Sequence, residues 1–200
     1  MIGNDVVDLG DADSRVAGHH PRFDDRVFTS TERDLIAANA AGERVRWLLW
    51  AAKESAYKAV RREDVRAVFS PSHFVVRMTP GSPATVEAEG RTFDVEFSGD
   101  EEHVHAIAYG HGDADAVVYG AVARLVPGAA STPSEVVRRI TLTTLSRLLG
   151  VAVADLAIDR DGRVPTLRLR GRPCAAEISL SHHGRFVAFA CRWPGRGWHA

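Results

Sequence analysis

The order of the predicted secondary-structure elements repeats once along this 200-residue chain, and this repeat limits the fold more than any other feature. Each half begins with a strand, continues with helical sequence and ends with short β-type segments separated by turns. The two halves end with similar segments, which are HVHAIAYG at 103–110 and GRFVAFACRW at 184–193. We therefore predict an α+β fold of two similar lobes related by a pseudo-two-fold axis.

The boundary between the halves falls in GHGDADA at 110–116, a short polar segment after the first series of strands. Because few contacts are expected to cross such a segment, it is a natural linker. We predict a first lobe over residues 1–115 and a second over residues 116–200.

Helices are expected at three places. Residues 42–63 carry apolar side chains at helical spacing and form the clearest helix. A second helix is expected over residues 133–149, with Gly150 as its C-cap. A third should begin at Thr29 or Ser30, whose hydroxyl groups can cap a helix N-terminus.

Composition limits the classes of function. The formal net charge is −1, so no overall positive field would attract nucleic acid. Two cysteines are too few for a disulfide framework, and the first residues lack the basic start and apolar run of a signal peptide. No segment approaches the roughly 18 apolar residues of a membrane helix. We predict a cytoplasmic protein that binds neither nucleic acid nor membrane.

Both lysines of the chain lie in WAAKESAYKA at 50–59, whereas its other basic residues are arginines. An ammonium group is a compact point charge, and a narrow site beside a phosphate or a metal could exclude a guanidinium group. The alternative is that the two lysines lie close together by chance. Trp50, Glu54 and Lys58 share one helical face. Lys53 is turned about 100° away, so a solvated position or a salt bridge is an equally good interpretation for it.

Two acids are candidates for a metal site. Asp5 lies in a predicted strand and Glu54 on the predicted helix, so the two carboxylates could meet around one cation. Magnesium is commonly held by one or two carboxylates together with water and substrate phosphates. The alternative for Asp5 is a turn or a helix cap. Asp8 should point to the opposite face of the strand from Asp5.

The segment ISLSHHG at 178–184 is a candidate phosphate site. Alternation along a strand places Ser179 and Ser181 on one face, with His182 at its end. Hydroxyl, imidazole and backbone N–H groups can all bind phosphate, and Arg163, beside a turn, could bind it in a bidentate manner. The alternative for His182 is a strand end packed against a loop.

Other metal and nucleotide sites are not indicated. His103 and His105 alternate along a predicted strand and are expected to be structural. No further Cys or His lies at the spacing that a zinc site needs, and the glycine-rich phosphate-binding motifs are absent from the sequence.

Four sequence blocks together resemble the 4′-phosphopantetheinyl transferase superfamily. They are GNDVVDL at 3–9, FTSTE at 28–32, WAAKESAYKA at 50–59, and DGRVPTL at 161–167 followed by ISLSH at 178–182. The W-x-x-K-E-x-x-x-K block is specific, and the others are weak individually. The block order is that of the small holo-acyl-carrier-protein synthases. Relative to longer transferases of the surfactin-synthetase type, the two lobes look exchanged.

The resemblance implies a magnesium-dependent reaction of coenzyme A. The enzyme would move the phosphopantetheine arm to a serine of an apo acyl or peptidyl carrier protein and release adenosine 3′,5′-bisphosphate. Asp5 and Glu54 would bind Mg²⁺, and Glu32 would support the site through a water molecule. Glu54, or a water that it orients, would take the serine proton, and Lys58 would neutralise the phosphates.

The resemblance also implies a binding site for coenzyme A. Ser181 and His182 would hold the nucleotide end, with His182 near the 3′-phosphate. Arg163 would replace the usual lysine or arginine of the family's turn, and either Arg138 or Arg139 would contact the adenosine phosphates. With both lobes in one chain, a monomer would contain a complete site.

One residue departs from the family pattern. Val7 stands where many two-lobed members have a third acid, which implies two protein carboxylates and an additional water on the metal. Arg15, Arg22 and Arg26 could form a basic rim for an acidic carrier protein. The alternatives are a coenzyme A-binding module without catalysis and a metal-dependent phosphohydrolase.

Overall fold

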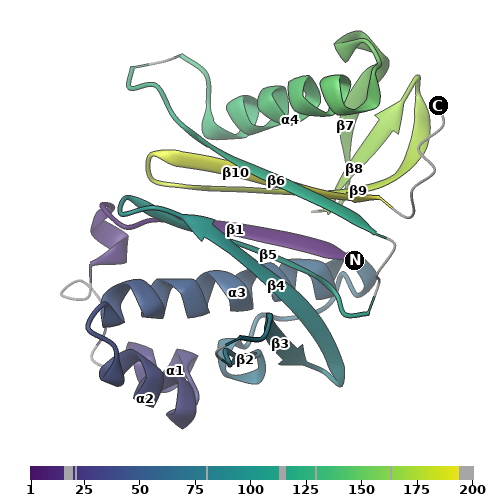
Figure 1. Cartoon of the computed structure of the whole chain (residues 1–200). Coiled ribbons are helices and arrows are strands. Elements are labelled where there is room, and N and C mark those ends of the chain that lie inside the picture. The colour runs from purple at the N-terminus through teal and green to yellow at the C-terminus, as the bar shows by residue number, and fades with distance from the viewer. Residues whose placement is uncertain are drawn as a thin grey trace.

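The computed structural model contains two five-stranded antiparallel sheets in the part of the chain that it describes, and Figure 1 shows their arrangement. The described residues are 1–15, 20, 22–79, 81–112, 116–128, 130–162 and 164–193. The first sheet has the strand order β1-β5-β4-β3-β2, and the second has the order β6-β10-β9-β8-β7. Matching β1 to β6, β2 to β7 and so on makes the two orders identical, so the predicted fold of two similar lobes is confirmed.

The bounds of the elements follow this repeat. The strands of the first sheet are β1 Ile2–Asp8, β2 Val75–Arg77, β3 Ala84–Ala88, β4 Arg91–Gly99 and β5 His103–Gly110. Those of the second are β6 Val117–Arg124, β7 Leu156–Asp161, β8 Val164–Leu169, β9 Arg172–His183 and β10 Phe186–Trp193. The α-helices are α1 Phe23–Val27, α2 Ser30–Ala38, α3 Gly42–Glu63 and α4 Pro133–Leu149. The 3-10 helices are η1 Ala12–Ser14, η3 Pro71–His73 and η4 Val153–Asp155.

The predicted helix ends are borne out. Thr29 caps α2 and exchanges hydrogen bonds with Glu32 in a capping box. Helix α4 has the predicted bounds, and Gly150 follows it in the left-handed conformation with φ 65°. In the described part of the chain, no helix has the length and hydropathy that crossing a bilayer requires. The predicted division at residues 115 and 116 stays a prediction, and residues 113–115 lie outside the described part.

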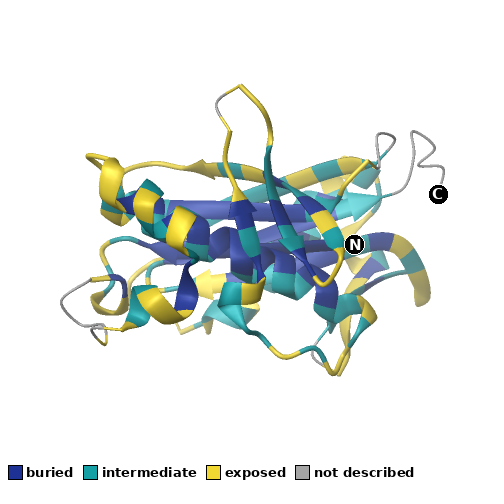
Figure 2. Ribbon diagram, turned by 90° about the horizontal axis from the view of Figure 1, so that it is seen from below, coloured by how far each residue is buried: buried dark blue, intermediate teal, exposed yellow. Residues whose placement is uncertain are grey.

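The two sheets face each other between two helices. Figure 1 shows α3 on the outer side of the first sheet and α4 on the outer side of the second. Strand β1 lies between the layers, because it packs on α3 and also on β9 and β10. All seven of its residues are buried, and Figure 2 shows buried residues concentrated along the central elements.

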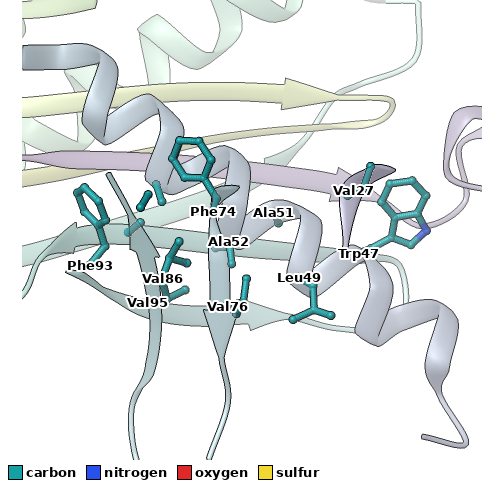
Figure 3. Packing of buried hydrophobic residues seen from close by; sticks show 14 of the residues in the cluster. Val27, Trp47, Leu49, Ala51, Ala52, Phe74, Val76, Val86, Phe93 and Val95 are labelled. Carbon is teal, nitrogen blue, oxygen red and sulfur yellow. The ribbon is translucent and has the colours of Figure 1, made fainter. Parts of the chain in front are cut away.

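The larger hydrophobic core lies beneath α3. Figure 3 shows Leu49 and Ala52 of this helix beside Val76, Val86 and Phe93 of the first sheet. Alanines on the buried face of α3 allow the sheet to approach closely, since they add little volume. A smaller core lies under α4 in the second lobe.

Gly3 brings β1 still closer to α3. A Cβ atom at this position would lie only 2.0 Å from the carbonyl oxygen of Ser55 and 2.8 Å from the backbone nitrogen of Ala59. Such distances are far below van der Waals contact, so only glycine fits here. The close approach places Asp5 beside the polar face of α3.

Candidate active site

Side chains of β9 bind the open edge of β1. Along this edge, three N–H groups that do not pair with β5 donate to alternate residues of β9, which lie on one face of that strand. The pairs are Asn4 to Ser179 Oγ at 3.0 Å, Val6 to Ser181 Oγ at 3.2 Å, and Asp8 to His183 Nδ1 at 3.1 Å. We call these bonds the side-chain ladder. It joins the two lobes and satisfies backbone donors that burial would otherwise leave unpaired.

Asp5 and Lys58 meet beside this ladder. The Nζ atom of Lys58 lies 2.8 Å from Asp5 Oδ1 and 3.0 Å from the carbonyl oxygen of Asn4. The hydroxyl group of Ser181 donates to the same Oδ1 atom at 2.9 Å. No described residue donates a hydrogen bond to Oδ2 of Asp5, so this oxygen has free acceptor capacity.

Glu54 is the second carboxylate of the site. It lies one helical turn before Lys58 and accepts no hydrogen bond from the described residues. Burial raises the pKa of the Glu54 carboxyl group above its ordinary value. The positive charge of Lys58 opposes this increase, and the negative charge of Asp5 adds to it. The charges of Asp5 and Lys58 therefore both act on the Glu54 carboxyl group.

A cleft of about 320 Å³ contains most of the predicted site residues. Its lining includes Asp5, Glu54, Lys58, Ser181 and His182. The structure thus brings together residues from both ends of the chain. The indole side chains of two tryptophans of α3, which sequence reasoning did not assign to the site, also line the cleft; these are Trp47 and Trp50.

A basic pocket of about 220 Å³ adjoins the cleft and shares His182 and Leu180 with it. Arg138 and Arg160 line it beside the N-terminal turn of α4. The structure therefore places Arg138 in this region, whereas Arg139 is exposed elsewhere on the helix. Arg160 was missed by sequence reasoning, although it stands just before the DGRVPTL block.

The predicted residue Arg163 lies outside the described residues. Arg61 and Arg62 line a further pocket that shares Lys58 and Leu180 with the cleft. Arg62 donates to the carbonyl oxygen of Ile178 at 2.6 Å, which ties α3 to β9.

Glu32 is not brought to the cleft. Its two carboxylate oxygens accept from Lys53, at 2.9 and 2.8 Å, and from the backbone N–H groups of Thr29 and Val76, each at 2.8 Å. Glu32 is 2% exposed and Lys53 is 0% exposed. The salt-bridge alternative for Lys53 is therefore what the structure shows. Glu32 does not line the cleft, so it is not one of the proposed metal-site residues.

Asp8 faces away from Asp5, as its place in the strand predicts. Its carboxylate accepts two bonds from the guanidinium group of Arg185, at 2.8 and 2.6 Å. This ion pair holds the pKa of Asp8 well below its usual range. Asp8 therefore joins β1 to the turn between β9 and β10, and it is not a ligand at the cleft.

The first part of the chain matches a known family model. The ACPS family model, described as the 4′-phosphopantetheinyl transferase superfamily, matches residues 1–110, which is more than half of the chain. The chain belongs to the 4′-phosphopantetheinyl transferase superfamily. The matched segment of this superfamily member includes Asp5, Glu54 and Lys58. Ser181 and His182 lie beyond it, in the second lobe.

Two further comparisons add little to this assignment. A search of curated proteins finds no match for this superfamily member. Among solved structures, it is similar to the crystal structure of Thermotoga maritima holo-[acyl-carrier-protein] synthase, with 12% sequence identity and a TM-score of 0.40. The likeness covers 86% of this chain and 83% of that chain.

Proposed function

We propose that this protein transfers the 4′-phosphopantetheine arm of coenzyme A to a serine of an apo acyl or peptidyl carrier protein. The second product is adenosine 3′,5′-bisphosphate. One observation carries the proposal: Asp5, Glu54 and Lys58 of the first lobe share a cleft with the SLSH strand of the second. Membership of the transferase superfamily supports it.

The donor set of the cleft fits a divalent cation. In the described part of the chain, no group of three or more His, Cys, Asp or Glu side chains is arranged to hold a metal. Two carboxylates, those of Asp5 and Glu54, line the same cleft, and Oδ2 of Asp5 and both oxygens of Glu54 have free acceptor capacity within the described residues. Mg²⁺ suits such a pair, because it retains waters and substrate phosphates as its other ligands. When bound, it would neutralise charge on the pyrophosphate.

Cationic side chains are placed for the phosphates of coenzyme A. Lys58 lies at the carboxylate pair, where the pyrophosphate would bind. His182 connects the cleft to the pocket of Arg138 and Arg160, which suits the 3′-phosphate of the adenosine. Lys58 would then bind the pyrophosphate of coenzyme A, and the pocket of Arg138 and Arg160 would bind its 3′-phosphate.

The transfer is a displacement at phosphorus. The serine oxygen of the carrier protein bonds to the phosphorus that bears the pantetheine arm, and the bond from that phosphorus to the bridging oxygen breaks. The electron pair leaves with adenosine 3′,5′-bisphosphate. Glu54, or a water that it orients, accepts the serine proton, and Lys58 stabilises charge on the reacting phosphate. Such a reaction depends mainly on alignment and on cations close to the developing charge.

Exposed arginines at and before α1 suit an acidic carrier protein. Arg15, Arg22 and Arg26 are exposed, and the last two flank or lie on α1. Electrostatic complementarity of this kind accelerates and orients association. Because one chain supplies both walls of the cleft, a monomer is sufficient for the reaction.

Intact-mass spectrometry tests the proposed function. Apo carrier proteins of several classes are incubated with the enzyme, coenzyme A and Mg²⁺. Wild-type enzyme should add the mass of phosphopantetheine to at least one of them, and Glu54→Gln and Asp5→Asn should abolish the gain while the melting temperature is retained. Glu43→Gln, an exposed acid on the same helix, is the matched control and should retain activity. No mass gain on any carrier protein, or release of free phosphopantetheine without one, contradicts the proposal.

A further inference from the structure

His183 is the last residue of the side-chain ladder, and it also lines the cleft. Its Nδ1 atom accepts from the N–H group of Asp8 at 3.1 Å. We propose that the Nε2–H group of His183 donates a hydrogen bond to a carbonyl group of the pantetheine arm of coenzyme A. The inference rests on the proposed function, because it concerns the substrate of that reaction.

The bond to Asp8 determines which ring nitrogen of His183 carries the hydrogen. A backbone N–H group can only donate, so Nδ1 must be unprotonated to accept from it. A neutral imidazole group then has its hydrogen on Nε2. Because the two ring nitrogens point in nearly opposite directions, the bond of Nδ1 to β1 turns Nε2 away from that strand. His183 is therefore a donor at Nε2, and it cannot take up the serine proton while this bond is kept.

The position of His183 along β1 points to the arm and not to the phosphates. Its partner Asp8 lies three residues beyond Asp5, which corresponds to about 10 Å along a strand. The proposed function places the pyrophosphate at Asp5 and Lys58. The basic pocket proposed for the 3′-phosphate is lined by His182 but not by His183. The pantetheine arm is joined to the pyrophosphate on the side opposite the adenosine, so it is the part of coenzyme A left to reach His183.

The surroundings of His183 suit the chemistry of the arm. Val7, Trp47 and Trp50 line the same cleft. The indole N–H group of Trp47 donates to the carbonyl oxygen of Ser14 at 2.8 Å, which fixes this wall of the cleft. Methyl and methylene groups of the arm can pack against these side chains, and its two amide carbonyl groups need donors. Within the described part of the chain, the Nε2–H group of His183 has no acceptor, so it is available to one of them.

Calorimetric titration of two ligands tests the inference. Coenzyme A is compared with adenosine 3′-phosphate 5′-diphosphate, which we call the armless nucleotide because it lacks only the pantetheine arm. The variants are His183→Asn, whose amide reaches the position of Nδ1, and His183→Gln, whose amide reaches that of Nε2. With Mg²⁺ present, His183→Asn should bind coenzyme A about three- to tenfold more weakly, as the loss of one neutral hydrogen bond implies. It should bind the armless nucleotide like the wild type, and His183→Gln should bind coenzyme A more tightly than His183→Asn.

Nitrogen NMR of the wild-type protein gives a second test, which does not depend on the folding of a variant. Two-bond ¹H–¹⁵N correlation spectra of ¹⁵N-labelled protein distinguish the two neutral tautomers of an imidazole group, and the signals of His183 are assigned through its backbone. We expect an unprotonated Nδ1 atom. The Nε2 signal should move more on addition of coenzyme A than on addition of the armless nucleotide.

Three results would overturn the inference: unchanged affinity of His183→Asn for coenzyme A, an equal loss of its affinity for both ligands, or a protonated Nδ1 atom in the wild type. Neither titration needs turnover, so the two proposals can fail separately. A protein with the expected His183-dependent affinity that modifies no carrier protein would contradict the proposed function alone. A protein that modifies a carrier protein, with unchanged affinity of His183→Asn for coenzyme A, would contradict this inference alone.

Discussion

Lys53 and Glu32 form an ion pair that is closed off from solvent, with the Nζ atom of Lys53 2.8 Å from Oε2 of Glu32. Lys53 also donates to the carbonyl oxygens of Pro71 and Phe74. Lys58, five residues further along α3, lines the cleft instead. The two lysines of the chain therefore have different roles: Lys53 holds the first lobe together, and Lys58 belongs to the candidate active site.

Replacing Lys53 by methionine should destabilise the fold strongly. The change would leave the carboxylate of Glu32 buried without its counter-ion, and breaking a buried pair in this way costs about 3–5 kcal/mol. Urea denaturation measures the free energy of unfolding. The double variant Lys53→Met/Glu32→Gln should lose less, because no charge is left unpaired. A loss below about 1 kcal/mol in the single variant would show that the pair does not have the structural role described above.

Replacing Lys58 by arginine should lower the transfer rate by about tenfold or more while the melting temperature is kept. The Nζ atom fits between Asp5 Oδ1 and the carbonyl oxygen of Asn4, at 2.8 and 3.0 Å. A guanidinium group is broader and would displace these partners or the phosphate. The measurement is kcat/KM for carrier protein modification, followed by mass. A rate near that of the wild type would show that the compact ammonium group is not required.

Removing the guanidinium group of Arg185 should weaken the joint between the lobes. Asp8 is 1% exposed and its pKa is lowered mainly by hydrogen bonding to Arg185. A carboxyl group with a lowered folded-state pKa stabilises the fold above its unfolded pKa, about 3.9, and this stability is lost as the pH falls below that value.

We therefore expect Arg185→Gln to lower the free energy of unfolding at pH 7, because the buried carboxylate of Asp8 loses its guanidinium partner. Below about pH 4, the free energy of unfolding of this variant should fall less than that of the wild type. Arg124→Gln is the control: Arg124 pairs with the exposed Glu102, and its removal should cost about 0.5 kcal/mol or less. Equal effects of the two variants would argue against a specific role for Asp8 and Arg185.

His105 should make stability depend on pH in a higher range. It is 1% exposed on β5, and burial lowers the pKa of its imidazole group to about 4. The charge of Asp5 opposes this decrease, whereas those of His103 and Lys58 add to it. The unfolded chain, with a pKa of about 6.5, takes up the proton more readily. The free energy of unfolding should thus fall by up to roughly 3 kcal/mol as the pH drops from about 6.5 to 4.

Urea denaturation between pH 7 and pH 4 measures this dependence in the wild type and in His105→Gln. The variant has no imidazole group at this position, so its stability should change less over the same range. Parallel curves for the two proteins would mean that another group is responsible.

The sequence predicts the positions of site residues best where those residues lie close together in one helix or one strand. Helical periodicity puts Glu54 and Lys58 on one face, and strand alternation separates Asp5 from Asp8; both predictions agree with the structure. The capping pattern around Glu32 correctly predicts a helix start. Its ion pair with Lys53, 21 residues away, depends on the packing of α2 against α3 and is invisible to local patterns.

The bonds between the lobes were also beyond sequence reasoning. Alternation places Ser179 and Ser181 on one face, but their partners lie 175 residues earlier on β1. Only the fold shows that Ser181 approaches Asp5. Arg160 was missed for a similar reason, because its place beside Arg138 depends on α4 packing over β7.

The central claim is that Asp5 and Glu54 share one divalent cation with the pyrophosphate of coenzyme A. Anomalous diffraction from crystals grown with Mn²⁺ and coenzyme A tests it most directly. We predict one anomalous peak within coordination distance of both carboxylates and of the pyrophosphate oxygens. Coenzyme A bound in the cleft with the Mn²⁺ peak away from either carboxylate would contradict it.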